Sequence, residues 1–242
     1  MHRFYLDSVD LKTKKAFILA DEAKHAYKVL RLKKNDQVIA FDGKGNQYTG
    51  ILESINPREA VIEIQNIVHL EPRLPKITLA AAIPKQSKFD AIVDKSTQLG
   101  VDIIIPLLTE RTIVKPGLLN QEDKIKRWQK IAIEAAKQCG RVYVPQIAPL
   151  HKFARIAENA DKFDLCLIAA LDQNTVVLKD VLKNRKPKNV LVLIGPEGDF
   201  TSEEVESARN FSAIAVSLGP NVLRCETAVT MLLSVLNYEW KT

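Results

Sequence analysis

The sequence lacks the motifs of several large classes of protein. It contains neither G-x-x-x-x-G-K-[S/T] nor G-x-G-x-x-G, so it has neither of the common loops that bind nucleoside triphosphates or dinucleotides. Its three cysteines are odd in number and show no C-x-x-C spacing, which argues against a disulfide framework and is consistent with a reducing compartment. The four histidines lack the spacing of metal ligands, and we expect no metal site.

Long hydrophobic runs are also missing. No apolar stretch approaches the length that crosses a bilayer, and residues 1–6 are too short for a signal peptide. We therefore expect a cytoplasmic protein with no membrane partner. With 242 residues, 46% of them hydrophobic and 26% charged, the chain is typical of a globular protein with one large or two small domains.

Apolar patterning in the first 70 residues predicts four short strands, at 16–19, 37–41, 48–55 and 60–67. Between the second and the third strand, the chain has the glycines and the asparagine of a hairpin turn. Asp42 is therefore expected to be a turn residue and not a metal ligand. With one helix at 23–30, these strands predict a small β-barrel-like domain.

The segment Glu71–Pro75 carries two prolines, which break regular structure, and it divides the chain into predicted domains 1–71 and 76–242. Beyond it, continuous apolar runs alternate with amphipathic helices. Such runs are typical of parallel strands covered on both faces, and they lie at 77–83, 102–108, 165–171, 190–194 and 213–218. Helices are predicted around 89–99, 128–136 and 226–238, and a capping box at Thr201–Glu204 begins another. The predicted fold class is α/β.

Two glycine-containing loops follow the last two apolar runs. They are Ile-Gly-Pro-Glu-Gly-Asp-Phe at 194–200 and Leu-Gly-Pro-Asn-Val-Leu-Arg-Cys-Glu-Thr-Ala at 218–228. Each loop leaves a strand, turns at Gly and Pro, and enters a helix, as in the ligand crevices of α/β proteins. Glu197 and Asp199 would repel a polyphosphate and favour a ligand with a cationic centre. The alternative, a tight turn without a ligand, is weakened because two such loops occur together.

Basic residues gather near the predicted first helix. Lys24, Lys28 and Arg31 would share one face of a helix at 23–30, with no acidic residue between them. A phosphate backbone is one natural partner for such a face, and a solvated surface is the alternative. Further lysines at positions 12, 14 and 15 favour RNA.

The two glycine loops carry a resemblance to a known family. The strings GPEGDF and LGPNVLRCETA resemble the SPOUT-class ribosomal RNA methyltransferases that act on N3 of a uridine in small-subunit RNA. Other segments agree along nearly the whole chain, namely His25 with 29–31, 41–45, Lys85, 95–101, Pro106, 110–111 and 134–141. Three positions depart from the pattern: Asp199 and Gln98, where the family usually has Gly and Glu, and Asn221, where a basic residue is common.

The resemblance implies a fold and an activity. The expected fold is a knotted C-terminal SPOUT domain with a parallel sheet, preceded by a PUA-like RNA-binding domain, and the chain is expected to form a homodimer. The expected activity is methylation of N3 of a uridine in 16S ribosomal RNA with S-adenosyl-L-methionine (SAM), on naked RNA or on the assembled small subunit. The alternatives are a SPOUT enzyme for another RNA nucleotide and a non-catalytic RNA-binding protein that retains the fold.

Site residues follow from the loops and from the resemblance. Residues expected to bind the cofactor are Leu171, Ile194, Gly195, Pro196, Glu197, Gly198, Leu218, Gly219, Val222, Leu223, Arg224, Thr227 and Ala228. Residues expected to bind RNA are Lys24, His25, Lys28, Arg31, Lys85, Arg111 and Arg141.

Methyl transfer at N3 requires loss of a proton, so a general base or a group that stabilises the uridine anion is expected. The catalytic candidates are the acids Glu197 and Glu226 and the cations Arg224 and Arg141. For Glu226 the alternative is an acid that merely favours the start of the last helix. Cys225 is expected to be a packing residue, because attack on carbon does not suit methylation at a ring nitrogen.

The last predicted helix also bears on assembly. Its apolar positions include Met231, Leu232, Leu233, Val235 and Leu236, which exceed one narrow stripe. Surplus apolar surface predicts a two-fold dimer interface, which Leu233→Glu or Leu236→Glu would break. The alternative is that these residues belong to the core of their own domain, so that the substitutions unfold the chain.

Overall fold

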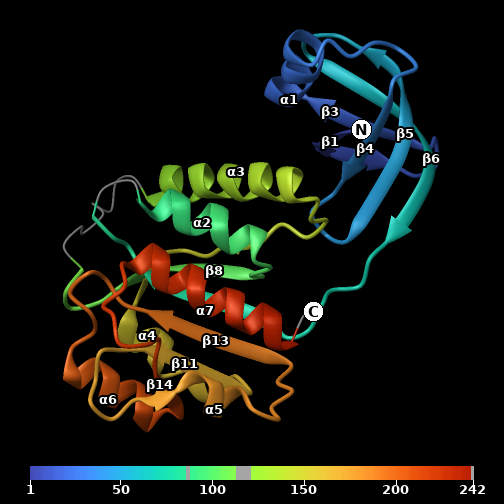
Figure 1. Cartoon of the computed structure of the whole chain (residues 1–242). Coiled ribbons are helices and arrows are strands. Elements are labelled where there is room, and N and C mark those ends of the chain that lie inside the picture. Colours follow the sequence, from blue (N-terminus) through green and yellow to red (C-terminus); the bar gives the residue numbers. More distant parts are fainter. Residues whose placement is uncertain (86–87, 113–120, 241–242) are drawn as a thin grey trace. The chain divides into compact units, whose positions relative to one another are not determined.

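The computed structural model describes residues 1–85, 88–112 and 121–240 (Figure 1). The chain forms two compact units. One comprises Met1–Pro72 with Ile133–Val144, and the other comprises Arg73–Ala132 with Pro145–Thr242. The segment Ile133–Val144 returns to the N-terminal unit although it lies far along the chain. No helix in the described ranges is long and apolar enough to cross a membrane.

The first unit is built on a six-stranded sheet with the order β1-β4-β5-β6-β3-β2. The strands are β1 His2–Tyr5, β2 Ser8–Asp10, β3 Lys15–Leu19, β4 Gln37–Phe41, β5 Asn46–Ile55 and β6 Glu59–His69. The four predicted strands are confirmed. The sequence pattern missed β1 and β2, which are short, and β1 pairs in parallel with β4, a strand far from it in sequence. Phe4, Ile18, Val38, Leu52 and Ile62 form the centre of the core.

The turn between β4 and β5 is held by Asp42, as predicted. Its Oδ1 accepts the Lys44 N–H at 2.8 Å, and its Oδ2 accepts from the side-chain amide of Asn46 at 2.6 Å. Such bonds from an aspartate to the next residues of its own turn fix the hairpin locally.

The predicted first helix differs from its expected form. An α-helix, α1 (Ala20–Lys24), continues into a π-helical turn, η1 (His25–Val29), where the Leu30 N–H donates to the His25 carbonyl. Arg31 follows the end of this helix with a φ of 54°. The prediction that Lys24, Lys28 and Arg31 share one helical face is therefore wrong, because the spacing of i, i+4 and i+7 residues applies only within a continuous α-helix.

The second unit contains a parallel sheet, and this confirms the predicted α/β class. Its order is β10-β8-β7-β13-β11-β14-β12, with β9 beside β8. The strands are β7 Lys76–Ala82, β8 Ile103–Leu108, β9 Gln146–Ile147, β10 His151–Lys152, β11 Leu165–Ala169, β12 Val176–Val177, β13 Asn189–Ile194 and β14 Ala213–Ser217. The five predicted strands are confirmed. The three that were missed have two residues each, too few to show a pattern.

The helices of the second unit are α2 Lys88–Gln98, α3 Gln121–Cys139, which continues into the first unit, α4 Phe153–Ala157, α5 Leu178–Leu182, α6 Ser202–Asn210 and α7 Cys225–Trp240. Helices α2 and α7 lie side by side (Figure 1). Helix α6 begins at the predicted capping box, since the Thr201 hydroxyl accepts the Glu204 N–H and the Glu204 carboxylate accepts the Thr201 N–H. The helix start directly after the first glycine loop is thereby fixed by local sequence.

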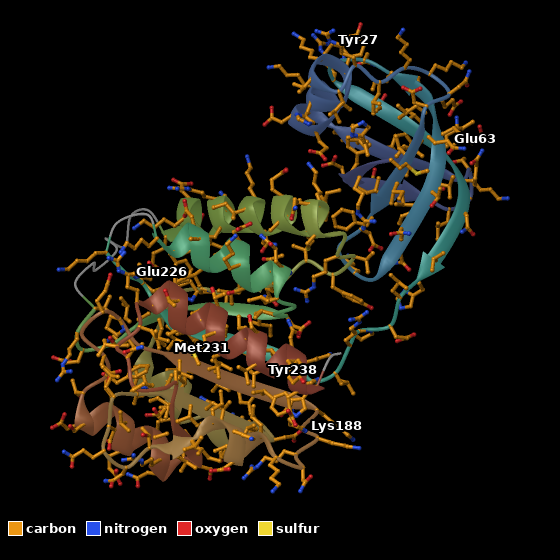
Figure 2. All side chains as sticks on the ribbon, in the orientation of Figure 1. Tyr27, Glu63, Lys188, Glu226, Met231 and Tyr238 are labelled. Atoms are coloured by element: carbon orange, nitrogen blue, oxygen red, sulfur yellow. The ribbon has the colours of Figure 1, made fainter. Side chains whose placement is uncertain are left out.

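Helix α7 buries more of its apolar surface than the sequence suggested. Leu232, Leu233 and Leu236 have no exposed surface within the single chain. This burial favours the alternative for Leu233→Glu and Leu236→Glu, because a carboxylate at either position would enter the core of the unit and unfold the chain and would not act on a dimer interface. Met231 and Tyr238 remain 40% and 78% exposed, two turns apart on α7 (Figure 2).

Candidate active site

The first glycine loop leaves β13 and ends where α6 begins. The Asp199 N–H donates to the Pro196 carbonyl at 3.0 Å, which closes a tight turn. The guanidinium of Arg111 donates to the carbonyls of Gly198 at 2.7 Å and Phe200 at 3.2 Å. Arg111, which the sequence placed among the RNA-binding residues, therefore braces the loop from the end of β8.

The second glycine loop connects β14 to α7. The Ser217 hydroxyl accepts the Gly219 N–H at 3.2 Å. Gly219 has a φ of 118°, a backbone conformation that residues with a β carbon rarely adopt. The Arg224 carbonyl accepts the N–H groups of Thr227 and Ala228, both at 2.9 Å, so α7 starts from this residue. The loop thus needs glycine for its backbone path, whatever it binds.

A pocket lies where these two loops meet the end of β11. Strands β13, β11 and β14 are neighbours in the sheet and run parallel, so their carboxyl ends meet at one edge. Of the residues expected to bind a cofactor, those that line the pocket are Leu171, Ile194, Gly195, Pro196, Glu197, Leu218, Gly219, Val222, Leu223 and Ala228. Among the described residues, Gly198, Arg224 and Thr227 do not line it.

Sequence reasoning missed seven lining residues: Ala169, Ala170, Asp199, Val216, Ser217, Asn221 and Cys225. Three of them, Asp199, Asn221 and Cys225, lie within the two loops and could have been included with their neighbours. The others come from the last residues of the β11 and β14 segments. The rule that ligands bind at the carboxyl ends of parallel strands would have indicated these positions once the strand order was known.

The pocket combines apolar walls with acidic groups. Glu197 and Asp199 line it, and no Lys or Arg does so among the residues that the structure describes. Two carboxylates and no cation disfavour a polyphosphate and suit a ligand that carries positive charge. Side chains such as Ile194, Val216 and Leu223 offer an apolar surface to the rest of such a ligand.

Two carboxylates gather around Cys225, at the start of α7. Burial first, and then the charges of Glu197 and Glu226, raise the pKa of the Cys225 thiol to about 12. The thiol is 3.8 Å from the Ala82 carbonyl at the end of β7. A neutral, buried thiol is a poor nucleophile, so the geometry favours the packing role that was expected for Cys225.

The two acids differ in their partners. Glu197 accepts the backbone N–H of Lys85 at 3.2 Å. Glu226 has its Oε1 3.9 Å from the ammonium of Lys88, and its Oε2 is buried without a hydrogen-bond partner among the described residues. Figure 2 shows Glu226 at the beginning of α7. A buried carboxylate oxygen with free lone pairs is able to accept a proton or an N–H group.

The remaining predicted residues lie elsewhere. Arg224 is exposed directly before α7. Lys24, His25 and Lys28 are exposed on α1 and η1 of the first unit, and Arg141 follows α3 in the same unit. In the part of the chain that the structure describes, no group of His, Cys, Asp and Glu residues has the geometry of a metal site.

Comparison with known proteins places the chain in a family. A family model described as an RNA methyltransferase domain matches residues 71–237, and one described as an RNA methyltransferase PUA domain matches residues 18–65. The chain is also 35% identical to the ribosomal RNA small subunit methyltransferase E of Synechocystis, over 87% of this chain and 68% of that protein. It belongs to the ribosomal RNA small subunit methyltransferase E family.

Two solved structures resemble this family member along nearly its whole length. Ribosomal RNA small subunit methyltransferase E from Neisseria gonorrhoeae, bound to S-adenosyl methionine, is 28% identical with a TM-score of 0.88 and covers 99% of this chain and 98% of its own. A protein from Legionella pneumophila, in complex with the bound cofactor SAM, is 30% identical with a TM-score of 0.88 and covers 98% of this chain and 96% of its own.

The structure gives reasons for two of the departures from the usual pattern of the methyltransferase E family. Asp199 has a φ of 60°, where Gly is the least strained residue, but aspartate tolerates this region better than most side chains. Gln98 donates from its side-chain amide to the Asp94 carboxylate, at 3.1 Å, so its side chain makes a contact within α2. Asn221 is exposed and lines the pocket.

Proposed function

We propose that this protein methylates N3 of a uridine in 16S ribosomal RNA with SAM as the methyl donor. The observation that carries the proposal is the acidic pocket at the carboxyl ends of β11, β13 and β14, in a chain similar over its whole length to a SAM-bound methyltransferase E. An acidic pocket whose described lining residues include no Lys or Arg fits a sulfonium cofactor and does not fit a polyphosphate.

The residues present fit SAM in two ways. Apolar side chains from the ends of the three strands offer a surface for the adenosyl group, and turned backbone in both loops offers N–H and C=O groups for its polar atoms. Glu197 would offer negative charge to a sulfonium or ammonium group, and Asp199 adds to the negative charge of the pocket. We assign cofactor binding to the lining residues, with Gly198, Arg224 and Thr227 as neighbours that support the loops.

Bound SAM supplies an electrophilic methyl group, and the protein must align the acceptor and remove its proton. We assign the general base to Glu226, whose Oε2 has no hydrogen-bond partner among the described residues. Glu197 is the weaker candidate because its carboxylate already accepts the Lys85 N–H. The cationic Arg224 is the proposed stabiliser of charge on the uridine oxygens, and Arg141 is a second candidate for that role.

Substrate binding and assembly complete the proposal. The PUA-like domain, predicted at 1–71 and followed by the methyltransferase domain at 76–242, is proposed to bind the RNA, with Lys24, His25, Lys28 and Arg31 as phosphate contacts. Lys85, Arg111 and Arg141 are also proposed to bind the RNA, although Arg111 also braces the first loop. The chain is proposed to have the trefoil knot expected of its fold, and to act as a homodimer in the cytoplasm on ribosomal RNA or the small subunit.

Nucleoside analysis tests the activity directly. The purified protein is incubated with SAM and with small subunits, or naked 16S RNA, from a strain without the corresponding gene. Mass spectrometry of the nucleosides should show one new N3-methyluridine. Methylation at another position, or SAM binding without any methylation, would contradict the proposal in favour of another SPOUT activity or of a non-catalytic role.

Paired variants test the assignment of the base. Glu226→Gln should lower the methylation rate by about 100-fold or more, with SAM affinity within twofold of the unmodified protein. Glu197→Gln is the matched control, since it removes a neighbouring carboxylate by the same chemistry. At saturating SAM, which offsets any loss of cofactor affinity, it should reduce the rate less than tenfold. A larger loss in Glu197→Gln would transfer the role of base to Glu197.

A further inference from the structure

One wall of the pocket comes from a segment without regular structure. Residues 170–175 connect β11 to β12, and Ala170 and Leu171 line the pocket. Leu171 is 61% exposed, so little packing of its own side chain holds it in place. Ala170 is buried and its N–H donates to the Val216 carbonyl at 3.3 Å, so it is the Leu171 part of the wall whose position depends on further polar contacts.

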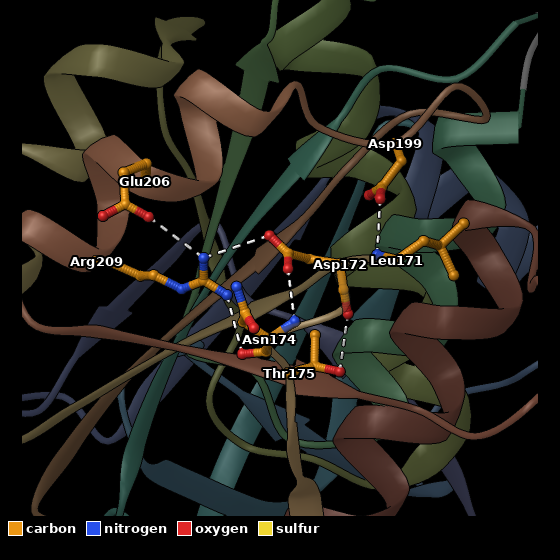
Figure 3. A network of polar contacts seen from close by, with 7 residues as sticks. All are labelled: Leu171, Asp172, Asn174, Thr175, Asp199, Glu206 and Arg209. Carbon is orange, nitrogen blue, oxygen red and sulfur yellow. Dashed lines mark hydrogen bonds and ion pairs between the residues drawn. The ribbon is translucent and has the colours of Figure 1, made fainter.

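The first of these contacts comes from Asp199. Its Oδ2 accepts the Leu171 N–H at 2.7 Å (Figure 3). Asp199 lies in the first glycine loop and lines the same pocket. The φ of Asp199 is 60°, a backbone conformation in which glycine would be less strained than aspartate. The bond to Leu171 therefore depends on a side chain that is present at a backbone cost. The bond joins the two loops that leave β11 and β13.

The second contact comes from Arg209, near the end of α6. Its Nη2 donates to the Asn174 carbonyl at 2.9 Å, and its Nη1 lies 3.3 Å from the Asp172 carboxylate (Figure 3). Asp172 also accepts the Asn174 N–H at 2.7 Å and, through its carbonyl, the Thr175 hydroxyl at 3.1 Å. The Asn174 N–H bond and Arg209 lower the pKa of the Asp172 carboxyl, so it carries a negative charge at neutral pH and attracts the Arg209 guanidinium.

We propose that Asp199 and Arg209 are positioning residues that clamp the 170–175 segment and thereby hold the Leu171 wall of the cofactor pocket in its binding conformation. Asp199 holds the segment at Leu171, and Arg209 holds it at Asp172 and Asn174. Both anchors come from the loop and helix that follow β13. The position of the Leu171 wall thus depends on the position of the first glycine loop and of α6. The identity of the ligand rests on the proposed function, but the clamp itself does not.

Hydrogen exchange without ligand tests the clamp. Asp199→Gly removes the carboxylate and relaxes the backbone, and it should increase the exchange rate of the Leu171 amide about threefold to tenfold. Asp199→Asn keeps an acceptor oxygen at the same place and should restore most of the protection. Unchanged exchange at Leu171 in Asp199→Gly would overturn the proposal, as would loss of protection in Asp199→Asn equal to that in Asp199→Gly.

Titration calorimetry with SAM then links the clamp to binding. Asp199→Gly and Arg209→Gln should each weaken SAM binding about threefold to tenfold, with melting temperatures close to that of the unmodified protein. Glu206→Gln is the matched control, because Glu206 contacts Arg209 from the same helix, at 3.3 Å, and does not touch the segment. Its SAM affinity should not change.

The two proposals fail in different ways. If the unmodified protein does not bind SAM, the proposed function is wrong, while the exchange of Leu171 still tests the clamp. If SAM binds but its affinity is the same in Asp199→Gly, Arg209→Gln and the unmodified protein, the clamp does not position the pocket wall. Weaker binding in Asp199→Gly with unchanged Leu171 exchange would instead show direct contact between Asp199 and the cofactor.

Discussion

Replacement of Gly219 by alanine separates a backbone requirement from an effect of side-chain bulk. A β carbon built on Gly219 has no heavy atom within 4 Å, so alanine introduces no clash. Its φ of 118° is nevertheless outside the conformations that alanine adopts at low energy. Gly195 is less suitable for this test, because a β carbon there would lie 3.2 Å from the Phe200 backbone nitrogen within the same loop.

The expected magnitude follows from the backbone strain. A residue with a β carbon held in a sparsely populated region costs about 1–3 kcal/mol. Gly219 lies in a solvent-exposed loop, so we expect the loop to relax locally and the chain to remain folded. Relaxation lowers the fraction of molecules with a binding-competent loop, and the apparent Kd for SAM rises by the inverse of that fraction. A cost of about 1–3 kcal/mol corresponds to a Kd increase of roughly 5- to 150-fold.

Gly140 provides the matched control. It also has a positive φ, 80°, and no heavy atom within 4 Å of a built β carbon, but it belongs to the first unit. Gly140→Ala should destabilise that unit by about 1–2 kcal/mol and leave SAM affinity unchanged. Calorimetry and thermal melts are measured on both variants. A folded Gly219→Ala protein with the SAM affinity of the unmodified chain would refute the argument that this loop conformation is required for binding.

Three further predictions follow from burial and charge. At pH 8 iodoacetamide should modify the exposed Cys139 but not Cys225 in the folded protein. Cys225 is buried, and its raised pKa of about 12 keeps the thiol protonated at that pH, so rapid modification of Cys225 would contradict its burial. Met231→Glu, at an exposed position of α7, should shift the proposed dimer to monomer in light scattering with less than about 0.5 kcal/mol loss of stability, and an unchanged mass would remove this face from the interface. Lys24→Ala with Lys28→Ala should reduce the slope of log K for RNA against log salt by about 0.7–0.9 per lost phosphate contact, whereas an unaltered slope would indicate a solvated surface.

Local patterns in the sequence determined much of this fold. The continuous apolar runs predicted β7, β8, β11, β13 and β14 because strands covered on both faces are apolar throughout. The capping box at Thr201 fixed the start of α6, and the turn residues at Asp42 fixed the hairpin between β4 and β5. In each case the interacting groups are close in the chain, so their spacing carries the information.

Features of the fold that depend on contacts between distant segments were not predicted. The parallel pairing of β1 with β4 and the return of Ile133–Val144 to the first unit depend on contacts between remote segments. Leu233 appeared available for a dimer because an apolar residue on a helix does not reveal which surface covers it. The contact of Arg111 with the first glycine loop was also missed, because a cation in a sequence does not reveal which carbonyls it meets in the fold.

The candidate site likewise has parts that local sequence predicts and parts that depend on long-range contacts. The sequence by itself determined the two glycine loops, their acidic residues and the helices that follow them, because each loop is a local break between a strand and a helix. Only the tertiary structure placed the end of β11 between these loops, since the strand order β13-β11-β14 is a long-range property of the sheet. That order brings Leu171 within hydrogen-bonding distance of Asp199, and it adds the end of β11 as a third wall to the pocket of the two loops.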